Sequence, residues 1–234
     1  MAPPSPLRFA LDDFAGWKID WSLTPGLSLL LGPPDSRASA LVGQVSARFS
    51  SRANPRDLGP AEKARFLALC QRVLPGMPDP MDLVHRTHGP DASEVIYLLR
   101  SVLTTTLDAA MAAPLSNLHP VPLRRLVRVL HEEALARGIP VLSASPSPVV
   151  LDAVGQLTGL ERVFVLDAEG LAQGQPRPVP FLTVPGHEDL DPLDVPSLFL
   201  RGELLARPGR PAQAPQAGAS AAGPAGPSQS RTAG

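Results

Sequence analysis

The stretch from Leu29 to Ser39 reads Leu-Leu-Leu-Gly-Pro-Pro-Asp-Ser-Arg-Ala-Ser. It contains the end of a continuous apolar run, residues 27–31, which is typical of a short strand buried on both faces of a sheet. Gly32 ends this run, and a helix-compatible segment begins near Ser36. A buried strand, a glycine turn and a helix in this order predict the first strand–loop–helix unit of an α/β fold.

This corner is where a phosphate-binding loop of the form G-x-x-x-x-G-K-[ST] would lie, with backbone N–H groups and a lysine around the phosphates. Gly32 matches the first glycine and Ser39 the terminal hydroxyl, but Arg37 replaces the second glycine and Ala38 the lysine. The candidate nucleotide-contacting residues are Gly32, Asp35, Ser36, Arg37 and Ser39. Asp35 equally suits the N-cap of the following helix. The loop raises the question of whether this chain derives from a nucleotide-hydrolysing enzyme and no longer has the residues needed for catalysis.

Strand and helix signals alternate over the rest of the chain. Strands are predicted at 7–11, 18–23, 27–31, 109–113, 139–143, 163–167 and 179–183, and helices at 36–49, 60–74, 91–107, 120–137, 149–157 and 195–205. This alternation predicts an α/β fold in which helices flank a mixed sheet, with an N-terminal antiparallel strand pair. If the strands ending at 31, 113 and 143 are parallel, the segments after them share the carboxyl edge of the sheet, where ligands bind.

Composition divides the chain into two parts. Residues 1–206 carry the predicted domain. Residues 207–234 contain no Leu, Ile, Val or aromatic residue. Such a segment buries too little apolar surface to offset its ordering entropy, so we predict a disordered Ala/Gly/Pro-rich tail.

Charge and cysteine content narrow the class of protein. The chain has 234 residues, a net charge of −1 and one cysteine, Cys70. This charge does not favour generic electrostatic binding to nucleic acid, and one cysteine excludes an intrachain disulfide and a Cys-based zinc site. His85 and His88 lack a third ligand, so no metal site is predicted. With no signal-peptide pattern and no apolar run of about 18 residues, we expect a cytoplasmic protein that does not bind membranes.

The segment from Pro114 to Pro120 reads Pro-Leu-Ser-Asn-Leu-His-Pro, and an amphipathic helix, Gly138, a strand and Ser147-Pro148 follow it. In this order it resembles the second half of an ABC-type P-loop ATPase head, in particular the chromosome-maintenance, RecF-like and overcoming-lysogenisation-defect AAA-type ATPases. In that family an Asp-Glu-Pro strand end, a Leu-His-Pro loop and a Thr-His-Ser-Pro strand end follow one another. The resemblance implies a P-loop NTPase-like fold and places residues 32–39 on the family's phosphate loop.

The same resemblance implies that the catalytic positions are degenerate. The family's Asp-Glu pair, which holds magnesium and activates water, falls on Ala112 and Ala113, and its switch histidine falls on Pro146. The loop lysine falls on Ala38. None of these four side chains can bind a cation, accept a proton or donate to a phosphate. We therefore expect negligible hydrolysis and no required cofactor; ATP with magnesium is expected only if nucleotide binding survives.

Three further positions match segments through which paired heads of this family meet. Ser93 falls in the signature segment, and Asn117 and His119 fall in the loop before the long amphipathic helix. Local structure offers plainer alternatives for the same residues. Asp91 with Glu94 has the pattern of a capping box, and Asn117 or His119 suits the N-cap of the next helix.

The expected function is that of a pseudo-ATPase, a nucleotide-independent or binding-only module that pairs with itself or with an active ATPase head. The resemblance implies DNA repair or phage defence as its setting, and it is the only ground for a nucleic-acid partner. Two alternatives stay open. One is a divergent, active ATPase in which Arg37 replaces the lysine and Asp35 or Asp108 binds magnesium. The other is a protein-interaction domain that binds no nucleotide.

Overall fold

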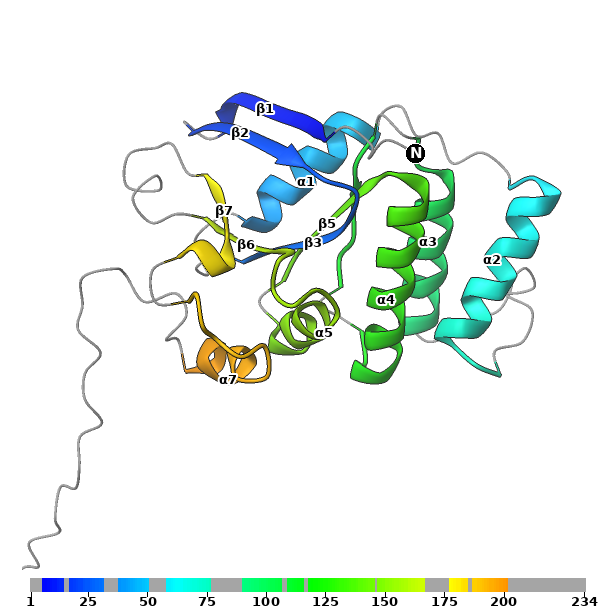
Figure 1. Cartoon of the computed structure of the whole chain (residues 1–234). Helices are drawn as coiled ribbons and strands as arrows, with labels where there is room; N and C mark the ends of the chain where they lie inside the picture. Colours follow the sequence, from blue (N-terminus) through cyan, green and yellow to red (C-terminus); the bar gives the residue numbers. More distant parts are fainter. Residues whose placement is uncertain are drawn as a thin grey trace, which may run out of the picture.

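A mixed five-stranded sheet between helices forms the centre of the computed structural model (Figure 1). The structure describes residues 6–14, 17–31, 38–50, 58–76, 90–106, 109–115, 118–145, 147–166, 177–184 and 187–201. The strands are β1 (Leu7–Phe14), β2 (Trp17–Leu23), β3 (Gly26–Leu31), β4 (Met111–Ala112), β5 (Pro140–Ala144), β6 (Val163–Leu166) and β7 (Pro178–Pro180). The helices are α1 (Ala38–Ser50), α2 (Pro60–Val73), α3 (Pro90–Thr104), α4 (Pro120–Arg137), α5 (Pro148–Thr158), the 3₁₀ helix η2 (Phe181–Thr183) and α7 (Val195–Leu200). None of the described helices is long and apolar enough to cross a membrane.

The strand order in the sheet is β4-β5-β3-β6-β7. β3 pairs in parallel with β5 on one side and β6 on the other, β4 pairs in parallel with β5, and β7 is antiparallel to β6. β1 and β2 form a separate antiparallel pair. The predicted fold class, a mixed sheet flanked by helices with an N-terminal antiparallel pair, is therefore confirmed. The carboxyl ends of β3, β4 and β5 also lie at one edge, as predicted.

Alternation along the strands separates two hydrophobic clusters on opposite faces of the sheet. In β3, Leu27, Leu29 and Leu31 belong to the large cluster beneath α2, α3, α4 and α5, whereas Leu30 belongs to the smaller cluster beneath α1 and the β1–β2 pair. Trp21 of β2 closes the smaller cluster with an edge-to-face contact to Phe164 of β6, at a centroid distance of 5.4 Å. Both faces of β3 are thus covered, which explains why its sequence is apolar apart from the buried Ser28.

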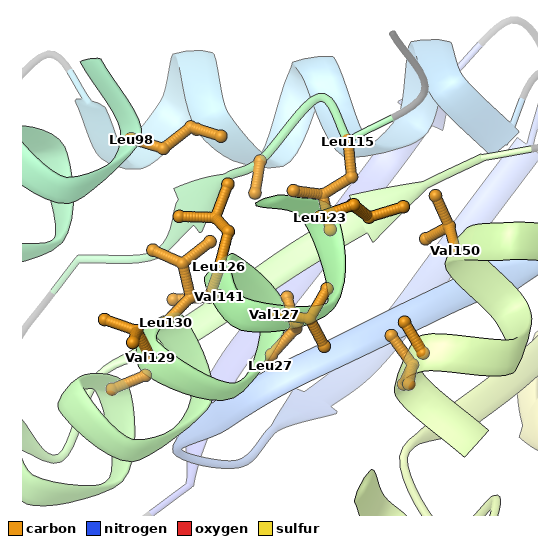
Figure 2. Close-up of a cluster of buried hydrophobic side chains, with 14 of the residues drawn as sticks. Leu27, Leu98, Leu115, Leu123, Leu126, Val127, Val129, Leu130, Val141 and Val150 are labelled. Atoms are coloured by element: carbon orange, nitrogen blue, oxygen red, sulfur yellow. The ribbon is translucent and has the colours of Figure 1, made fainter. Parts of the chain in front are cut away.

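Helix α4 supplies much of the large cluster (Figure 2). Its buried residues are Leu123, Leu126, Val127, Val129, Leu130, Glu133 and Ala134. The helix ends at Gly138, whose φ of 69° is the left-handed conformation that the sequence predicts for a C-cap glycine. An amphipathic pattern would bury Leu135 and expose Glu133 near this end, but the structure does the opposite. Leu135 is 45% exposed, whereas Glu133 is only 3% exposed.

Helix α2 explains the burial of Glu133, because it packs against α4 and brings an arginine to the carboxylate. Arg65 donates to Glu133 at 2.5 Å, with the Glu133 side chain 4% exposed. A second pair, Arg72 with Glu132 at 2.5 Å, is half exposed on both sides. Both pairs join α2 to α4, and only the Glu133 carboxylate is buried.

Several element boundaries differ from the predictions; among them, β1 runs to Phe14 and β4 is only two residues long. The predicted strand 179–183 is a short edge strand followed by the 3₁₀ helix η2, because Pro178 and Pro180 have no N–H to donate and suit only a sheet edge. Phe181 then turns inward, fully buried, and stacks on His187 with ring centroids 4.4 Å apart. Helix α3 ends at Thr104, whereas the prediction extended it to residue 107. At the observed end, threonine hydroxyls donate to the carbonyls of the last turn. The described part of the last helix, α7, ends at Leu200.

Candidate functional site

The candidate site lies at the carboxyl edge of the sheet, where β3 and β5 run side by side. The chain leaves β3 toward α1, which packs with the smaller cluster, and leaves β5 toward α5, which packs with the large one. Adjacent strands whose connections go to opposite faces define the switch point at which open α/β sheets bind ligands. The fold therefore directs attention to the segments that follow Leu31, Ala112 and Ala144.

The first of these segments is the one that the resemblance aligns with a phosphate loop. Gly32, Asp35, Ser36 and Arg37 lie outside the described residues. The structure places Ser39 in the first turn of α1, with an exposed side chain. Ala38, at the lysine position, is 8% exposed and packs in the smaller hydrophobic cluster. The residue at the lysine position thus serves α1 packing in this chain.

The second segment, after β4, is apolar. Ala112 ends the strand, and the N–H of Ala113 donates to the carbonyl of Leu142 at 2.7 Å. Ala113 is 1% exposed and Leu115 is fully buried, and both belong to the large cluster. Figure 2 shows Leu115 among the side chains of this core, near Leu123 at the start of α4. At the two positions where the resemblance expects carboxylates, the structure has methyl groups backed by hydrophobic core.

The third segment, after β5, carries hydroxyl groups. Ser143 is fully buried, and its Oγ has no hydrogen-bond partner. Ser145 is 4% exposed, and its Oγ accepts the N–H of Ser147 at 3.1 Å. Pro146 lies outside the described residues. Ser143 was not predicted as a site residue; its one signal in the sequence is a polar residue inside an otherwise apolar strand.

Of the three positions predicted to contact a partner, the structure describes Ser93 and His119. Ser93 is exposed near the start of α3, and Asn117 lies outside the described residues. His119 is the N-cap of α4, and its Nδ1 accepts the N–H of Val121 at 3.5 Å. The capping alternative for His119 is therefore confirmed. The capping box proposed for Asp91 and Glu94 is wrong, because α3 already begins at Pro90 and Asp91 lies within the helix.

Perturbed titratable groups of the described chain lie mostly away from this edge. Burial raises the pKa of Glu94 in α3, whose Oε1 is buried without a partner. Cys70 is fully buried in the large cluster, and this burial raises the pKa of its thiol to about 12. In the described segments no three His, Cys, Asp or Glu side chains come together in a way that could hold a metal ion.

The chemistry required by a magnesium–triphosphate complex gives a test of fit. Such a site needs a cation near the phosphates and a carboxylate in the magnesium shell. In the described part of the carboxyl edge, Ser39 offers a hydroxyl, while Ala38, Ala112 and Ala113 offer neither charge nor oxygen. These residues do not fit the complex, and no catalytic step through it can be derived from them.

Comparison with solved structures finds similar folds, among them an ATP-binding cassette. No protein-family model matches the sequence, and no curated protein is significantly similar to it. The fold is similar to a solved structure of a nucleotide-free ATP-binding cassette from an ABC transporter, with a TM-score of 0.38 and 14% sequence identity. The likeness covers 74% of this chain and 88% of the cassette. Nucleotide binding and transport belong to that protein.

Proposed function

We propose that this chain is a catalytically silent ATPase-like head that acts by binding a protein partner in the cytoplasm. The observation that carries the proposal is the apolar carboxyl end of β4, where Ala112 and Ala113 occupy the positions that the resemblance assigns to a magnesium ligand and a general base. Leu115, which follows them, is buried in the core. Among the described residues, this edge has no carboxylate. The order of the segments supports an ABC-type head of the chromosome-maintenance, RecF-like or overcoming-lysogenisation-defect group.

The expected loss of catalytic rate is large enough to predict no detectable ATP hydrolysis, as opposed to slower hydrolysis. Removing one preorganised electrostatic group from an active site typically costs about 3–4 kcal/mol, or a hundredfold to a thousandfold in rate. In this chain a lysine, a magnesium ligand, a base and a histidine are replaced at Ala38, Ala112, Ala113 and Pro146. Even with strong non-additivity, little of the catalysed rate would remain.

Pairing is the function that the resemblance implies for such a head. ABC-type heads act in pairs, and the resemblance places Ser93, Asn117 and His119 in the segments through which they meet. We propose a second copy of this chain or an active ATPase head as the partner. A setting in DNA repair or phage defence, with nucleic acid near the complex, follows from the family alone.

Titration of the purified chain with ATP and magnesium tests the proposal. The readouts are phosphate release and the shift in melting temperature. We expect no phosphate above a protein-free control. A rise in melting temperature would show that the head binds nucleotide without hydrolysing it, because a ligand of the folded state stabilises the protein. No shift would indicate a nucleotide-independent module.

Two variants make the test specific. Phosphate release that disappears in Arg37→Ala but persists in Arg125→Ala would overturn the proposal in favour of a divergent ATPase. Arg125 is a suitable control because it is an exposed arginine of α4 within the same chain. Release unchanged in both variants would point to a contaminating ATPase.

A further inference from the structure

A backbone donor at the start of β3 has no partner strand. Along β3, the N–H of Gly26 donates to Ile139 on the β5 side, and the N–H of Leu29 donates to Arg162 on the β6 side. The N–H of Leu27 therefore points to the β6 side, but the pairing with β6 begins only at Leu29. An unpaired buried N–H would be costly, so this position needs another acceptor.

The side chain of His131 supplies that acceptor. Its Nδ1, on α4, accepts the N–H of Leu27 at 3.2 Å. Gly26 leaves room for the ring: a Cβ at this residue would lie 3.2 Å from Cε1 and 3.3 Å from Nδ1 of His131. Leu27 is fully buried and the imidazole is half-buried. The ring thus supplies the acceptor that a paired strand would otherwise provide to this N–H.

We propose that His131 is a proton-sensitive tie between α4 and β3. The neutral ring, with its proton on Nε2, accepts the hydrogen bond from Leu27 and holds the first residues of β3. Protonation places an N–H on Nδ1, directly against the N–H of Leu27. The tie then opens, and the start of β3 loses its hydrogen bond to the helix.

The charged groups around the ring favour the neutral form at neutral pH. Burial lowers the pKa of His131 below its ordinary value near 6.5, and the Arg162 guanidinium on the turn before β6 acts in the same direction. The backbone of Leu27 and then Glu132, the neighbour on α4, act in the opposite direction, but burial and Arg162 outweigh them. Arg162 itself is held by a hydrogen bond to Thr24 at 2.5 Å. Gly26 and Leu27 of β3, and Leu135 of α4, bring no charge to the ring.

The sign of the effect on stability follows from this direction. Because the folded-state pKa of His131 is depressed, the unfolded chain binds a proton more readily than the folded chain. The contribution of the tie is complete above the unfolded pKa near 6.5. It is lost as the pH falls through the lower, folded-state pKa.

Amide hydrogen exchange of Leu27, corrected for intrinsic rates, tests the proposal on the full chain between pH 7.5 and pH 4.5. Leu29 is the internal reference, because its N–H bonds to a carbonyl. We expect Leu27 to lose protection relative to Leu29 as the pH falls. In His131→Asn, whose amide oxygen can replace Nδ1 without titrating, protection should persist across the range. In His131→Phe it should be absent throughout.

His187 provides a matched control. Burial lowers the pKa of this half-buried histidine as well, but it stacks on Phe181, away from β3. His187→Asn should therefore keep the wild-type pH dependence at Leu27. Equal protection of Leu27 at both ends of the pH range in the folded protein, or full protection in His131→Phe, would overturn the proposal.

Discussion

At the scale of single residues, a few positions are fixed by neighbours far away in the sequence. Gly26 is the clearest case, because its φ of +103° strongly disfavours a side chain and the His131 and Leu135 side chains crowd the space where a Cβ would be. The residue thus allows the chain to enter β3 directly beneath α4. The local sequence indicates only a glycine in a turn. The contact with His131 and Leu135 of α4 explains why no larger residue fits there.

Gly26→Ala should destabilise the protein by about 1–3 kcal/mol, because it combines backbone strain with crowding against His131. Gly43→Ala is the matched control, since a Cβ at this exposed helical position meets nothing within 4 Å. The control should stabilise α1 by about 0.5–1 kcal/mol. Urea unfolding of both variants measures the difference. A Gly26→Ala variant as stable as the wild type would contradict the described entry into β3.

The buried carboxylate of Glu133 is the second residue of this kind. A carboxylate 3% exposed depends on its cation, whereas an exposed pair contributes little. Arg65→Met should therefore cost more than Arg72→Met, about 1–3 kcal/mol against at most about 1 kcal/mol. The denaturation midpoints of the two variants test this order. Adding Glu133→Gln to Arg65→Met should recover part of the loss; equal costs for the two arginine variants would show that burial of Glu133 does not matter.

At the scale of elements, α4 organises the molecule. It contacts β3 and β5 beneath it and α2, α3 and α5 beside it. Both of its ends are marked in the sequence, by His119-Pro120 at the start and Gly138 at the end. The cap at His119 matters for function as well, because the same residue is the candidate partner contact.

His119→Asn and His119→Ala separate these two roles. Asparagine is a strong N-cap, so this variant should keep the thermal stability of the wild type, whereas alanine should lose about 0.5–1 kcal/mol. A partner that recognises the imidazole would bind both variants more weakly. Melting temperature and light scattering of the paired complex measure the two effects. Unchanged stability in His119→Ala would contradict the capping role.

At the scale of the whole molecule, periodicity predicted the fold well because its signals are strong and local. The largely apolar run of β3, the amphipathic pattern of α4 and the strand pair near the N-terminus each lie close to where they were predicted. Errors fell where tertiary packing decides. Glu133 is buried because α2 delivers Arg65, and the last strand stops early because Phe181 turns into the core.

The candidate site was predicted less completely than the fold. The sequence predicted the shared carboxyl edge, and the resemblance assigned the alanines at 112 and 113; Ala113 is buried in the large cluster, whereas Ala112 is partly buried against the smaller one. The buried hydroxyl of Ser143 and the tie from His131 to Leu27 were missed. Both depend on strand neighbours that no local pattern reveals, since the acceptor and the donor of the tie lie 104 residues apart.

Single-turnover phosphate release from ATP tests the central claim most directly, with the protein in excess over labelled nucleotide and magnesium present. Under these conditions even one slow turnover per molecule is visible. A catalytically silent head predicts a time course that coincides with the protein-free control. Phosphate release above that control, abolished by Arg37→Ala and unaffected by Arg125→Ala, would contradict it.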